Sequence, residues 1–420
     1  MTATAYAATA GLAAPALRLL LARRVRRGKE IAARLGERRG IATLARPAGR
    51  LLWLHAASVG ETVSVLPLFS ELSRAAPDAT VLFTTGTVTS AELFARRKPE
   101  GRVLHQFAPL DVPRWVARFL DHWRPDAAAF VESEIWPNLL AACRRRSIPA
   151  ALVNARLSPR SFARWRRMPG FALDLFGGFA RIAAQSAADA DRLRALGAAA
   201  VATPGNLKFA APPLPVPSGD LAALRAAMAG RPVWLAASTH PGEEAAARAA
   251  HEALLPAHPG LLTVIVPRHP ERGAEVAAAL SGLAVTRRSL GEGPPAEAGV
   301  WIADTLGELG LFYAASGLAF VGGSLVPHGG QNVLEAARLG CAVLVGPHVR
   351  NFAEPVAVLA DAGALAQVPD AAGLVDALDV LLRDPARRAT MGEAGRAAAS
   401  RDADLPRHLA AMLADLLPPR

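Results

Sequence analysis

The residues best suited to chemistry lie where an apolar run meets a glycine-rich turn, in the stretch VGGSLVPHGGQNVLEAA at 321–337. Backbone N–H groups of such a turn can approach an anion closely, and a helix beginning at Val333 would add unpaired donors and partial positive charge. Glu335 would then reach a sugar hydroxyl beside that anion. This pattern indicates a nucleotide or nucleotide-sugar site, although an ordinary strand, turn and helix would use glycines in the same way.

Carboxylates follow two apolar runs in the first half of the chain. Glu61 lies three residues after Ser58, behind the run 51–55. It could act as a general base toward an attacking hydroxyl, but Ser-x-x-Glu is also a helix capping box. Glu132 and Glu134 follow a second run and would point to the same side of an extended chain. They could take part in catalysis, or they could stabilise the N-terminus of a helix.

Lys208 and Arg268 are the candidate cations. The chain has three lysines among its 47 basic residues, so a lysine at 208 suggests a need for a compact ammonium, unless it is a surface charge. Arg268 follows an apolar run and could hold a phosphate through a bidentate guanidinium. The segments STHPGEE (238–244) and DTLGE (304–308) follow two further runs, and Gly307 permits backbone contact with a base or ribose.

Alternating apolar and helical segments must position these residues. Strands are expected at 51–55, 80–85, 126–131, 150–154 and 181–184, then at 233–237, 262–266, 300–303, 318–321 and 342–345. Nearly continuous apolar strands separated by helices are typical of a parallel sheet covered on both faces. The proline-rich stretch 210–218 separates two such doubly wound domains, so chemistry is expected at strand ends in the cleft between them. The helical stretch 389–417 could pack back on the first domain.

The positive charge of the chain is concentrated at its N-terminus. Residues 1–50 hold eleven basic residues against two glutamates, a net of +9 out of a formal +11. Because a nucleic-acid groove would spread basic residues over a folded face, no nucleic-acid partner is expected. The apolar segment 5–22 precedes its charges, unlike a signal peptide, and Pro15 and Arg18 interrupt it. These features favour a membrane-associated helix with a basic flank on an anionic leaflet.

Missing motifs remove other classes of enzyme. No GxGxxG opens either domain and no GxxxxGK[ST] is present, which argues against a dinucleotide oxidoreductase and a P-loop NTPase. The absence of a GxSxG elbow argues against an α/β-hydrolase. The two cysteines, Cys143 and Cys341, lie far apart and outside any CxxC motif, which fits a reducing compartment without structural zinc.

In their order along the chain, these motifs resemble those of the bacterial transferases that add 3-deoxy-D-manno-octulosonic acid (Kdo) to a lipid A precursor. The matching segments are HAASVGET (55–62), ESEIWPNL (132–139), NARLS (154–158), GNLKF (205–209), STHPGEE (238–244), PRHPER (267–272), DTLGEL (304–309), GGSLVPHGGQNVLEAA (322–337) and GPHVRNF (346–352). Together they are highly specific and cover nearly the whole chain. The N-terminal apolar segment with its basic flank is also similar to that family's membrane anchor.

The resemblance implies an α/β fold of the GT-B type, in which two Rossmann-like doubly wound domains face a central cleft behind an N-terminal membrane-associated helix. The expected parts are an anchor with its basic flank (1–40), an acceptor domain (41–210), a linker (211–218) and a CMP-Kdo-binding domain (219–420). The implied donor is CMP-Kdo, and the acceptor is a lipid A precursor (lipid IVA) at the cytoplasmic side of the cell inner membrane. No metal or other cofactor is expected.

The resemblance also implies roles for individual residues. The family's catalytic base falls on Glu61, and its transition-state-stabilising carboxylate and lysine fall on Glu132 and Lys208. Its CMP contacts fall on Pro267, Arg268, Leu306, Gly307, Glu308, Asn332, Val333, Leu334 and Glu335. The chemistry agrees, because loss of CMP from a tertiary anomeric carbon leaves an oxocarbenium-like centre that needs no metal-activated pyrophosphate. Glu61 would deprotonate the attacking sugar hydroxyl in a single displacement with inversion.

Two other functions stay open at this point. The protein could be another GT-B transferase that uses a UDP-sugar on a lipid acceptor, in which case UDP rather than CMP would compete with the donor. It could instead be a non-enzymatic membrane-surface protein, which predicts that Glu61→Ala and Arg268→Ala leave its function intact. The motifs do not report the number of Kdo residues added, because that number depends on the shape of the acceptor site.

Overall fold

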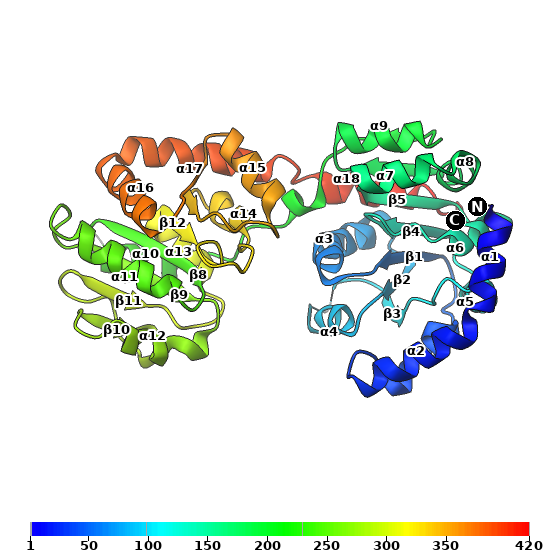
Figure 1. The fold of residues 1–420 in the computed structure, drawn as a ribbon, viewed down its shortest axis with the longest axis horizontal. Helices are drawn as coiled ribbons and strands as arrows, with labels where there is room; N and C mark the ends of the chain where they lie inside the picture. The colour runs from blue at the N-terminus through cyan, green and yellow to red at the C-terminus, as the bar shows by residue number, and fades with distance from the viewer. Residues whose placement is uncertain (1, 98, 229, 420) are drawn as a thin grey trace. The chain divides into compact units, whose positions relative to one another are not determined.

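The computed structural model describes residues 2–97, 99–228 and 230–419, and the chain divides into two compact units (Figure 1). Unit 1 consists of Met1–Ala211 and Asp402–Arg420, and unit 2 consists of Pro212–Arg401. The boundary between the units falls within the proline-rich stretch 210–218. Because the chain returns to unit 1 at Asp402, its C-terminal residues complete the unit in which it begins.

Unit 1 is built on one parallel sheet with the strand order β3-β2-β1-β4-β5-β6-β7. Its strands are β1 (Leu51–Ala56), β2 (Thr80–Thr85), β3 (Val103–Phe107), β4 (Ala127–Val131), β5 (Ala150–Ala155), β6 (Arg181–Ala184) and β7 (Val201–Ala202). The central strands are buried at every position, as the continuous apolar runs predicted. The sequence prediction missed β3 and β7, since β3 carries His105 and Gln106 and β7 has only two residues.

Helices cover this sheet, and serine side chains mark where several of them begin. The helices are α3 (Val59–Ala75), α4 (Val88–Arg97), α5 (Pro113–Trp123), α6 (Pro137–Arg145), α7 (Pro159–Arg166), α8 (Pro169–Phe176) and α9 (Ala187–Ala195). Ser58, Ser158 and Ser186 each accept a hydrogen bond from the N–H group three residues later. Such caps satisfy an otherwise unpaired donor and fix the point at which each helix leaves its loop.

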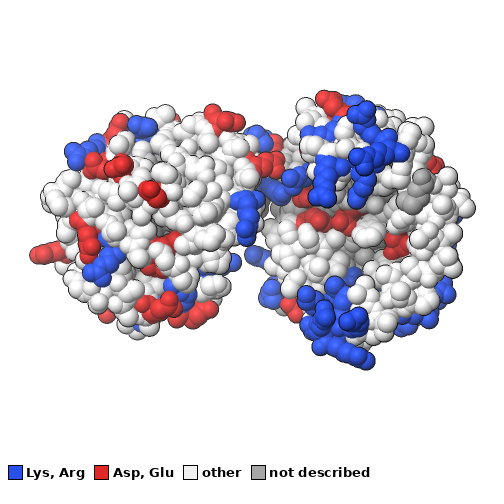
Figure 2. All heavy atoms as spheres, in the orientation of Figure 1, with Lys and Arg blue, Asp and Glu red and all other residues white. Residues whose placement is uncertain are grey.

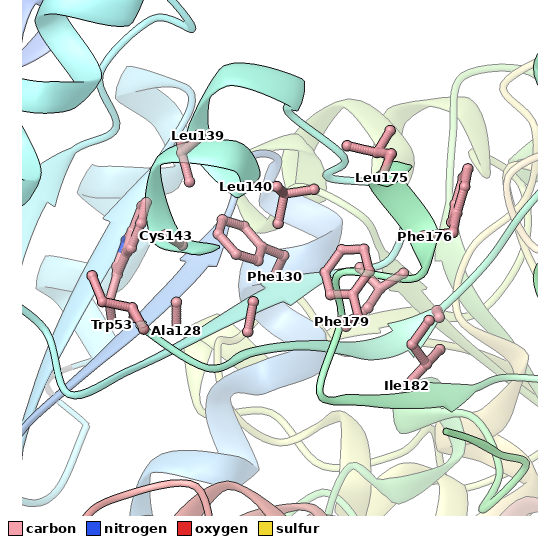
Figure 3. Packing of buried hydrophobic residues seen from close by; sticks show 14 of the residues in the cluster. Trp53, Ala128, Phe130, Leu139, Leu140, Cys143, Leu175, Phe176, Phe179 and Ile182 are labelled. Carbon is pink, nitrogen blue, oxygen red and sulfur yellow. The ribbon is translucent and has the colours of Figure 1, made fainter. Parts of the chain in front are cut away.

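Aromatic side chains fill one face of the unit 1 core (Figure 3). Trp53 of β1 packs against Phe119 and Phe130, with ring centroids 4.7 and 5.2 Å apart. Cys143 of α6 is buried among the same residues. Burying each large apolar side chain contributes about 1.5–3 kcal/mol, so this layer holds β1 and β4 rigidly in register. The C-terminal ends of these two strands carry the candidate catalytic residues.

The last helix of the chain packs in unit 1. Leu405, Leu409 and Leu413 of α18 (Leu405–Ala414) belong to the same buried cluster as Leu68 and Leu72 of α3. The preceding helix, α17 (Pro385–Ser400), lies in unit 2. The helical stretch expected at 389–417 is therefore two helices, of which α18 alone returns to the first unit.

Unit 2 is also built on one seven-stranded parallel sheet, with the strand order β10-β11-β9-β8-β12-β13-β14. It differs from unit 1 in that β11, the fourth strand of the unit, lies between β9 and β10. Its strands are β8 (Val233–Thr239), β9 (Leu262–Pro267), β10 (Val285–Arg287), β11 (Gly299–Ile302), β12 (Leu318–Val321), β13 (Ala342–Val345) and β14 (Leu365–Gln367). Its helices are α10 (Ser218–Met228), α11 (Glu243–Leu254), α12 (Gly273–Ala279), α13 (Leu309–Ser316), α14 (Val333–Arg338), α15 (Ala353–Asp361), α16 (Ala371–Arg383) and α17. In both sheets the strand order reverses beside the first strand, β1 or β8, where ligands bind in open α/β folds.

The N-terminal apolar segment forms two helices, α1 (Ala3–Leu12) and α2 (Ala14–Arg26). Within the described ranges, no single helix combines the length and apolarity needed to cross a membrane; α1 and α2 reach that threshold only as a pair bent by 55°. The rings of Tyr6 in α1 and Phe171 lie with their centroids 6.1 Å apart. The Tyr6 side chain also forms a hydrogen bond with the side chain of Asp111. The segment is therefore broken into two helices, and α1 packs on unit 1.

Part of the basic flank is folded into unit 1. Arg34 and Arg38 place their guanidinium groups 4.5 and 4.4 Å from the centre of the Phe107 ring. Glu37, fully buried, accepts two hydrogen bonds from Arg34, both at 2.8 Å, and Glu30 accepts from Arg38 at 3.1 Å. These arginines fasten the chain after α2 to the edge of the sheet.

Candidate active site

Glu61 lies in the first turn of α3, directly beyond the C-terminal end of β1. The N–H group of Ala57 donates to one carboxylate oxygen at 2.6 Å, and the hydroxyl of Ser58 donates to the other at 3.0 Å. The N–H group of Glu61 donates to Ser58 Oγ at 3.2 Å. The Ser58–Glu61 pair therefore does form the helix cap that the sequence left open, while the carboxylate stays partly exposed.

The surroundings of Glu61 favour its protonated form. Burial raises the pKa of Glu61, and the neighbouring charges of Glu134 and, to a smaller extent, Glu132 act in the same direction. The hydrogen bonds from Ala57 and Ser58 act against this change. A carboxylate with a raised pKa is the kind of group that can accept a proton from a hydroxyl near neutral pH.

Glu132 and Lys208 come together near the same strand ends. Glu132 follows β4 with a left-handed backbone (φ +55°), and its Oε1 lies 3.9 Å from Lys208 Nζ. Lys208 is in a short 3₁₀ turn (Leu207–Ala210), where its N–H group donates to Asn206 Oδ1 at 3.0 Å. Asn206 is held in turn by Asp402, which accepts its N–H group at 2.8 Å. The structure thus brings Glu132 and Lys208 together, and the charge of Glu132 also acts on Glu61.

The expectation of an extended chain through Glu132 and Glu134 was wrong. The chain turns sharply at Glu132, and the N–H group of Glu134 donates back to the carbonyl of Val131 at 3.1 Å. The same-side arrangement expected of an extended chain therefore does not apply to the two carboxylates. Both nevertheless act electrostatically on Glu61.

His55 is a site residue that the sequence prediction missed. His55 Nε2 lies 3.3 Å from Glu134 Oε2, and His55 Nδ1 lies 2.9 Å from the hydroxyl of Thr84. Trp136 Nε1 donates to the same Glu134 oxygen at 2.6 Å. Burial acts to raise the pKa of Glu134, but the hydrogen bonds from His55 and Trp136 bring it below its usual value. The available signal was a histidine near the end of the otherwise apolar run 51–56.

Basic side chains of two helices flank these carboxylates on the surface of unit 1. Figure 2 shows acidic atoms in a hollow over the ends of β1 and β4, with basic side chains gathered over α7 and over α2 on either side. The basic residues of these two helices are Arg160, Arg164 and Arg166 of α7 and Arg18, Arg23, Arg24 and Arg26 of α2. An acceptor with anionic groups around a reacting hydroxyl would match this pattern.

In unit 2, the glycine-rich turn after β12 does not hold its N–H groups ready for a ligand. The N–H groups of Gly323, Ser324 and Leu325 donate to the carboxylate of Glu243 at 2.7, 3.0 and 3.0 Å. The N–H group of His240 donates to the same carboxylate at 2.9 Å. Within the predicted anion-binding stretch 321–337, the part at 323–325 is thus occupied by a glutamate of the protein, Glu243, which is 1 % exposed. Its carboxylate ties the loop after β8 to the loop after β12.

The helix expected from Val333 does begin there, but it has only six residues, Val333–Arg338. Asn332 caps it by accepting the Leu334 N–H group at 3.2 Å, and the Asn332 side-chain amide donates to Glu335 Oε1 at 3.0 Å. Val333 and Leu334 are buried, so their side chains do not face solvent. The acidic side chain of Glu335 is partly exposed beside the cap.

The remaining predicted donor residues lie at strand ends of unit 2. Pro267 is the buried last residue of β9. Arg268 follows it and is exposed, and its backbone N–H group donates to the carbonyl of Thr239 at 3.0 Å. After β11, Leu306 is 85 % exposed and Gly307 has φ +87°. Leu306 therefore presents an apolar side chain to solvent at a position where a ligand could cover it.

Glu308 is engaged by an arginine that the sequence prediction did not consider. Arg288 donates to its two carboxylate oxygens at 2.8 and 2.5 Å, and the hydroxyl of Thr305 also hydrogen-bonds it. The hydrogen bond from Arg288 holds the pKa of Glu308 below its usual value. Glu308 is therefore a charged, oriented acceptor that a ribose hydroxyl could approach.

Among the residues that the structure describes, no group of three or more His, Cys, Asp or Glu side chains is arranged to hold a metal ion. The predicted site residues fall into two sets. Unit 1 carries the carboxylates and Lys208, and unit 2 carries Arg268 with the loops that end β9, β11 and β12.

Comparison with known proteins identifies the fold. The chain matches a glycosyltransferase from Rickettsia africae with a TM-score of 0.55 and 12% identity, covering 88% of this chain and 99% of that one. It matches a UDP-GlcNAc 2-epimerase from Neisseria meningitidis with a TM-score of 0.55 and 15% identity, covering 87% of this chain and all of that one. The two parallel sheets and these neighbours define a GT-B fold.

Sequence relatives identify the family. A family model described as 3-deoxy-D-manno-octulosonic-acid transferase (kdotransferase) matches residues 33–211. A 3-deoxy-D-manno-octulosonic acid transferase of Bordetella pertussis is 40% identical, over 84% of each chain. A probable mitochondrial transferase of the same name from Arabidopsis thaliana is 38% identical, over 88% of this chain and 86% of its own. The chain therefore belongs to the Kdo transferase family and is a glycosyltransferase.

Proposed function

We propose that this enzyme transfers Kdo from CMP-Kdo to a lipid A precursor, in a single inverting displacement with Glu61 as the general base. The observation that carries this proposal is the arrangement around Glu61, a partly exposed carboxylate with a raised pKa beside the Glu132–Lys208 pair. This base would take the proton of the attacking sugar hydroxyl as the new glycosidic bond forms. Membership of the Kdo transferase family supports the identity of the transferred sugar.

In this proposal unit 2 holds the donor. Arg268 would receive the charge of the departing phosphate, and Leu306, Gly307 and Glu308 would contact the nucleoside. The backbone of Asn332, Val333 and Leu334 and the side chain of Glu335 would complete the contacts to CMP. Lys208 and Glu132 would stabilise charge at the reacting carbon. Cleavage of a monophosphate from a tertiary anomeric carbon requires no activated pyrophosphate, so we expect transfer to persist in the presence of a chelator.

The direct test is transfer from CMP-Kdo, regenerated in situ, to lipid IVA by the purified full chain in detergent, with the products analysed by mass spectrometry. We expect the acceptor mass to rise by whole Kdo units, whose number counts the sugars added, and we expect CMP but not UDP to inhibit. Inhibition by UDP alone, with no Kdo product, would favour a UDP-sugar transferase. Unaltered function in cells carrying Glu61→Ala or Arg268→Ala would favour a scaffold without activity.

We also propose that the enzyme works at the cell inner membrane, with both units on the cytoplasmic side. Leu12, Leu19 and Leu20 of the N-terminal helices are 84, 64 and 49 % exposed, and they neighbour the arginines of α2. Exposed leucines beside basic side chains suit the interface of an anionic leaflet. The N-terminal helices would bring unit 1 to the surface in which a lipid acceptor resides.

Co-sedimentation with vesicles tests this placement. Binding should be stronger to vesicles containing phosphatidylglycerol than to pure phosphatidylcholine, and the double variant Leu19→Ser/Leu20→Ser should weaken it. Leu290→Ser is the matched control, because Leu290 is 63 % exposed on unit 2, outside the N-terminal helices. Equal loss of binding in both variants would contradict a specific role for α2.

A further inference from the structure

Two imidazole rings lie face to face at the C-terminal edge of the unit 2 sheet. His240 follows β8, and His328 lies in the loop after β12. Their ring centroids are 4.0 Å apart, and the ring planes differ by 24°. His240 is 8 % exposed, whereas His328 is exposed, so the pair has one buried ring and one ring open to solvent. The functions described so far do not use this pair.

The local backbone is built to hold these rings. Ser238 has a left-handed backbone (φ +55°), and the Glu243 carboxylate fixes the N–H group of His240. Gly323 leaves room for the buried ring, because a Cβ there would lie 3.3 Å from His240 Cδ2. Asn351 holds the second ring's loop by donating from Nδ2 to the carbonyl of His328 at 3.2 Å. Strain and dedicated hydrogen bonds of this kind are typical of functional positions.

Gln331 sets the protonation of the buried ring. Its side-chain nitrogen lies 3.0 Å from His240 Nε2, and an amide nitrogen can only donate. His240 Nε2 is therefore the acceptor, and the ring proton lies on Nδ1. Burial lowers the pKa of His240, and the neighbouring His328, His269 and Arg268 lower it further, against a smaller opposite effect of Glu243. A neutral ring with a defined N–H donor results.

The groups around His240 leave this edge short of negative charge. His328, His269 and Arg268 are all cationic or able to become so, and Glu243 already accepts four backbone N–H groups. Glu271 lies 3.8 Å from His269 but is itself exposed, outside the ring stack. A ligand with more than one anionic group would therefore be favoured at this edge.

The geometry points to the His240–His328 pair as the subsite for the carboxylate of the donor sugar, beside a phosphate held by Arg268. This inference rests on the proposed function, in which the donor carries a carboxylate and a phosphate on the same carbon. The two oxygens of a carboxylate can accept from Nδ1–H of His240 and from a ring N–H of His328. A nucleotide-activated neutral sugar has no group for this subsite, so the pair would select sugar acids.

The test compares CMP-Kdo, which carries the sugar with its carboxylate, with CMP, which lacks the whole sugar. His328→Phe and His240→Phe keep an aromatic ring but remove its hydrogen-bonding nitrogens. For each variant we would measure the KM for CMP-Kdo and, by calorimetry, the Kd for CMP, which has the phosphate but no sugar carboxylate. We expect the KM for CMP-Kdo to rise about tenfold or more and the Kd for CMP to stay within twofold. His408→Phe, an exposed histidine of α18 in unit 1, should change neither value.

Two results would overturn the inference. A parallel rise of the KM for CMP-Kdo and the Kd for CMP would assign the pair to the nucleotide or phosphate, and unchanged values in both variants would assign it to packing alone. His328 is exposed, so its variant tests the subsite even if His240→Phe lowers stability. A wild-type protein that binds CMP but transfers no Kdo would contradict the proposed function instead, which separates the two failures.

Discussion

Two glutamates occupy equivalent places in the two units but differ in exposure and in the number of hydrogen bonds that they accept. Glu61 follows β1 and Glu243 follows β8, the first strand of each sheet, and each begins a helix or lies in its first turn. Glu61 accepts one N–H group and one hydroxyl and stays partly exposed beside two other carboxylates. Glu243 accepts four N–H groups and is 1 % exposed.

The difference shows what separates a reactive carboxylate from a structural one on the same fold. Four N–H donors satisfy Glu243 fully, so its charge is stabilised and none of its oxygens faces solvent. Glu61 has fewer donors and like-charged neighbours, which leaves it able to take a proton. Unit 1 therefore keeps its carboxylate for chemistry, whereas unit 2 uses the corresponding one to fix the loops that carry His240 and His328.

Glu61→Gln should have the largest effect on catalysis. Because the amide oxygen can still accept from Ala57 or Ser58 while the base is lost, we expect kcat to fall by about 10²–10⁴ without loss of fold.

Folding raises the pKa of Glu61, so the stability from this group is fullest below its unfolded pKa and declines as the pH rises toward its folded pKa. At pH 7 the variant should thus not lower Tm. If Glu61→Gln retained activity, Glu61 would be a helix-capping residue and not the catalytic base.

Glu243→Gln should show the reverse pattern. An NH₂ group facing backbone N–H donors leaves them unsatisfied, so we expect the free energy of unfolding to fall by about 3 kcal/mol. Urea denaturation followed by tryptophan fluorescence would measure this loss, since Trp234 and Trp301 are buried in unit 2. Glu61→Gln is the matched control. Equal stability of the two variants would remove the distinction between the two glutamates.

Lys208→Met should reduce kcat by about a hundredfold, because it removes the ammonium beside Glu132 from a site where charge develops. Lys208→Arg tests whether charge alone suffices, and we expect it to restore only part of the rate, since guanidinium is planar and larger. Steady-state kinetics with saturating acceptor would measure both. A change confined to KM in the methionine variant would place Lys208 in ground-state binding instead.

Much of the fold could be predicted from the sequence, because continuous apolar runs such as those of β1 and β8 specify buried parallel strands. Glu61 and Glu132 could also be singled out, since polar residues that follow such runs meet at one edge of the sheet, whereas Lys208 is singled out by the rarity of lysine in the chain. Their catalytic roles stay predictions. The prediction failed where long-range contacts decide the outcome. The turn at Gly322 and Gly323 was predicted to bind an anionic ligand. Instead, the carboxylate of Glu243, about eighty residues earlier along the chain, accepts the N–H group of Gly323.

The partners of the site residues were equally hidden from sequence reasoning. The contact between His55 and Glu134 joins positions 79 residues apart, and that between Gln331 and His240 joins positions 91 apart. Nothing in the local spacing reports either contact. Glu132, whose left-handed backbone turns the chain away from an extended course, likewise donates its N–H group to the carbonyl of Val153 in β5.

The pH dependence of kcat/KM tests most directly whether Glu61 is the base and whether its neighbours tune it. Because burial and Glu134 raise the pKa of Glu61, the wild-type rate should fall as the pH drops through this raised value. Glu134→Gln removes the neighbouring charge and should move this acid limb to lower pH, whereas Asp121→Asn, on the exposed face of α5, should leave it in place. An acid limb that stays fixed or moves to higher pH in Glu134→Gln would contradict the account.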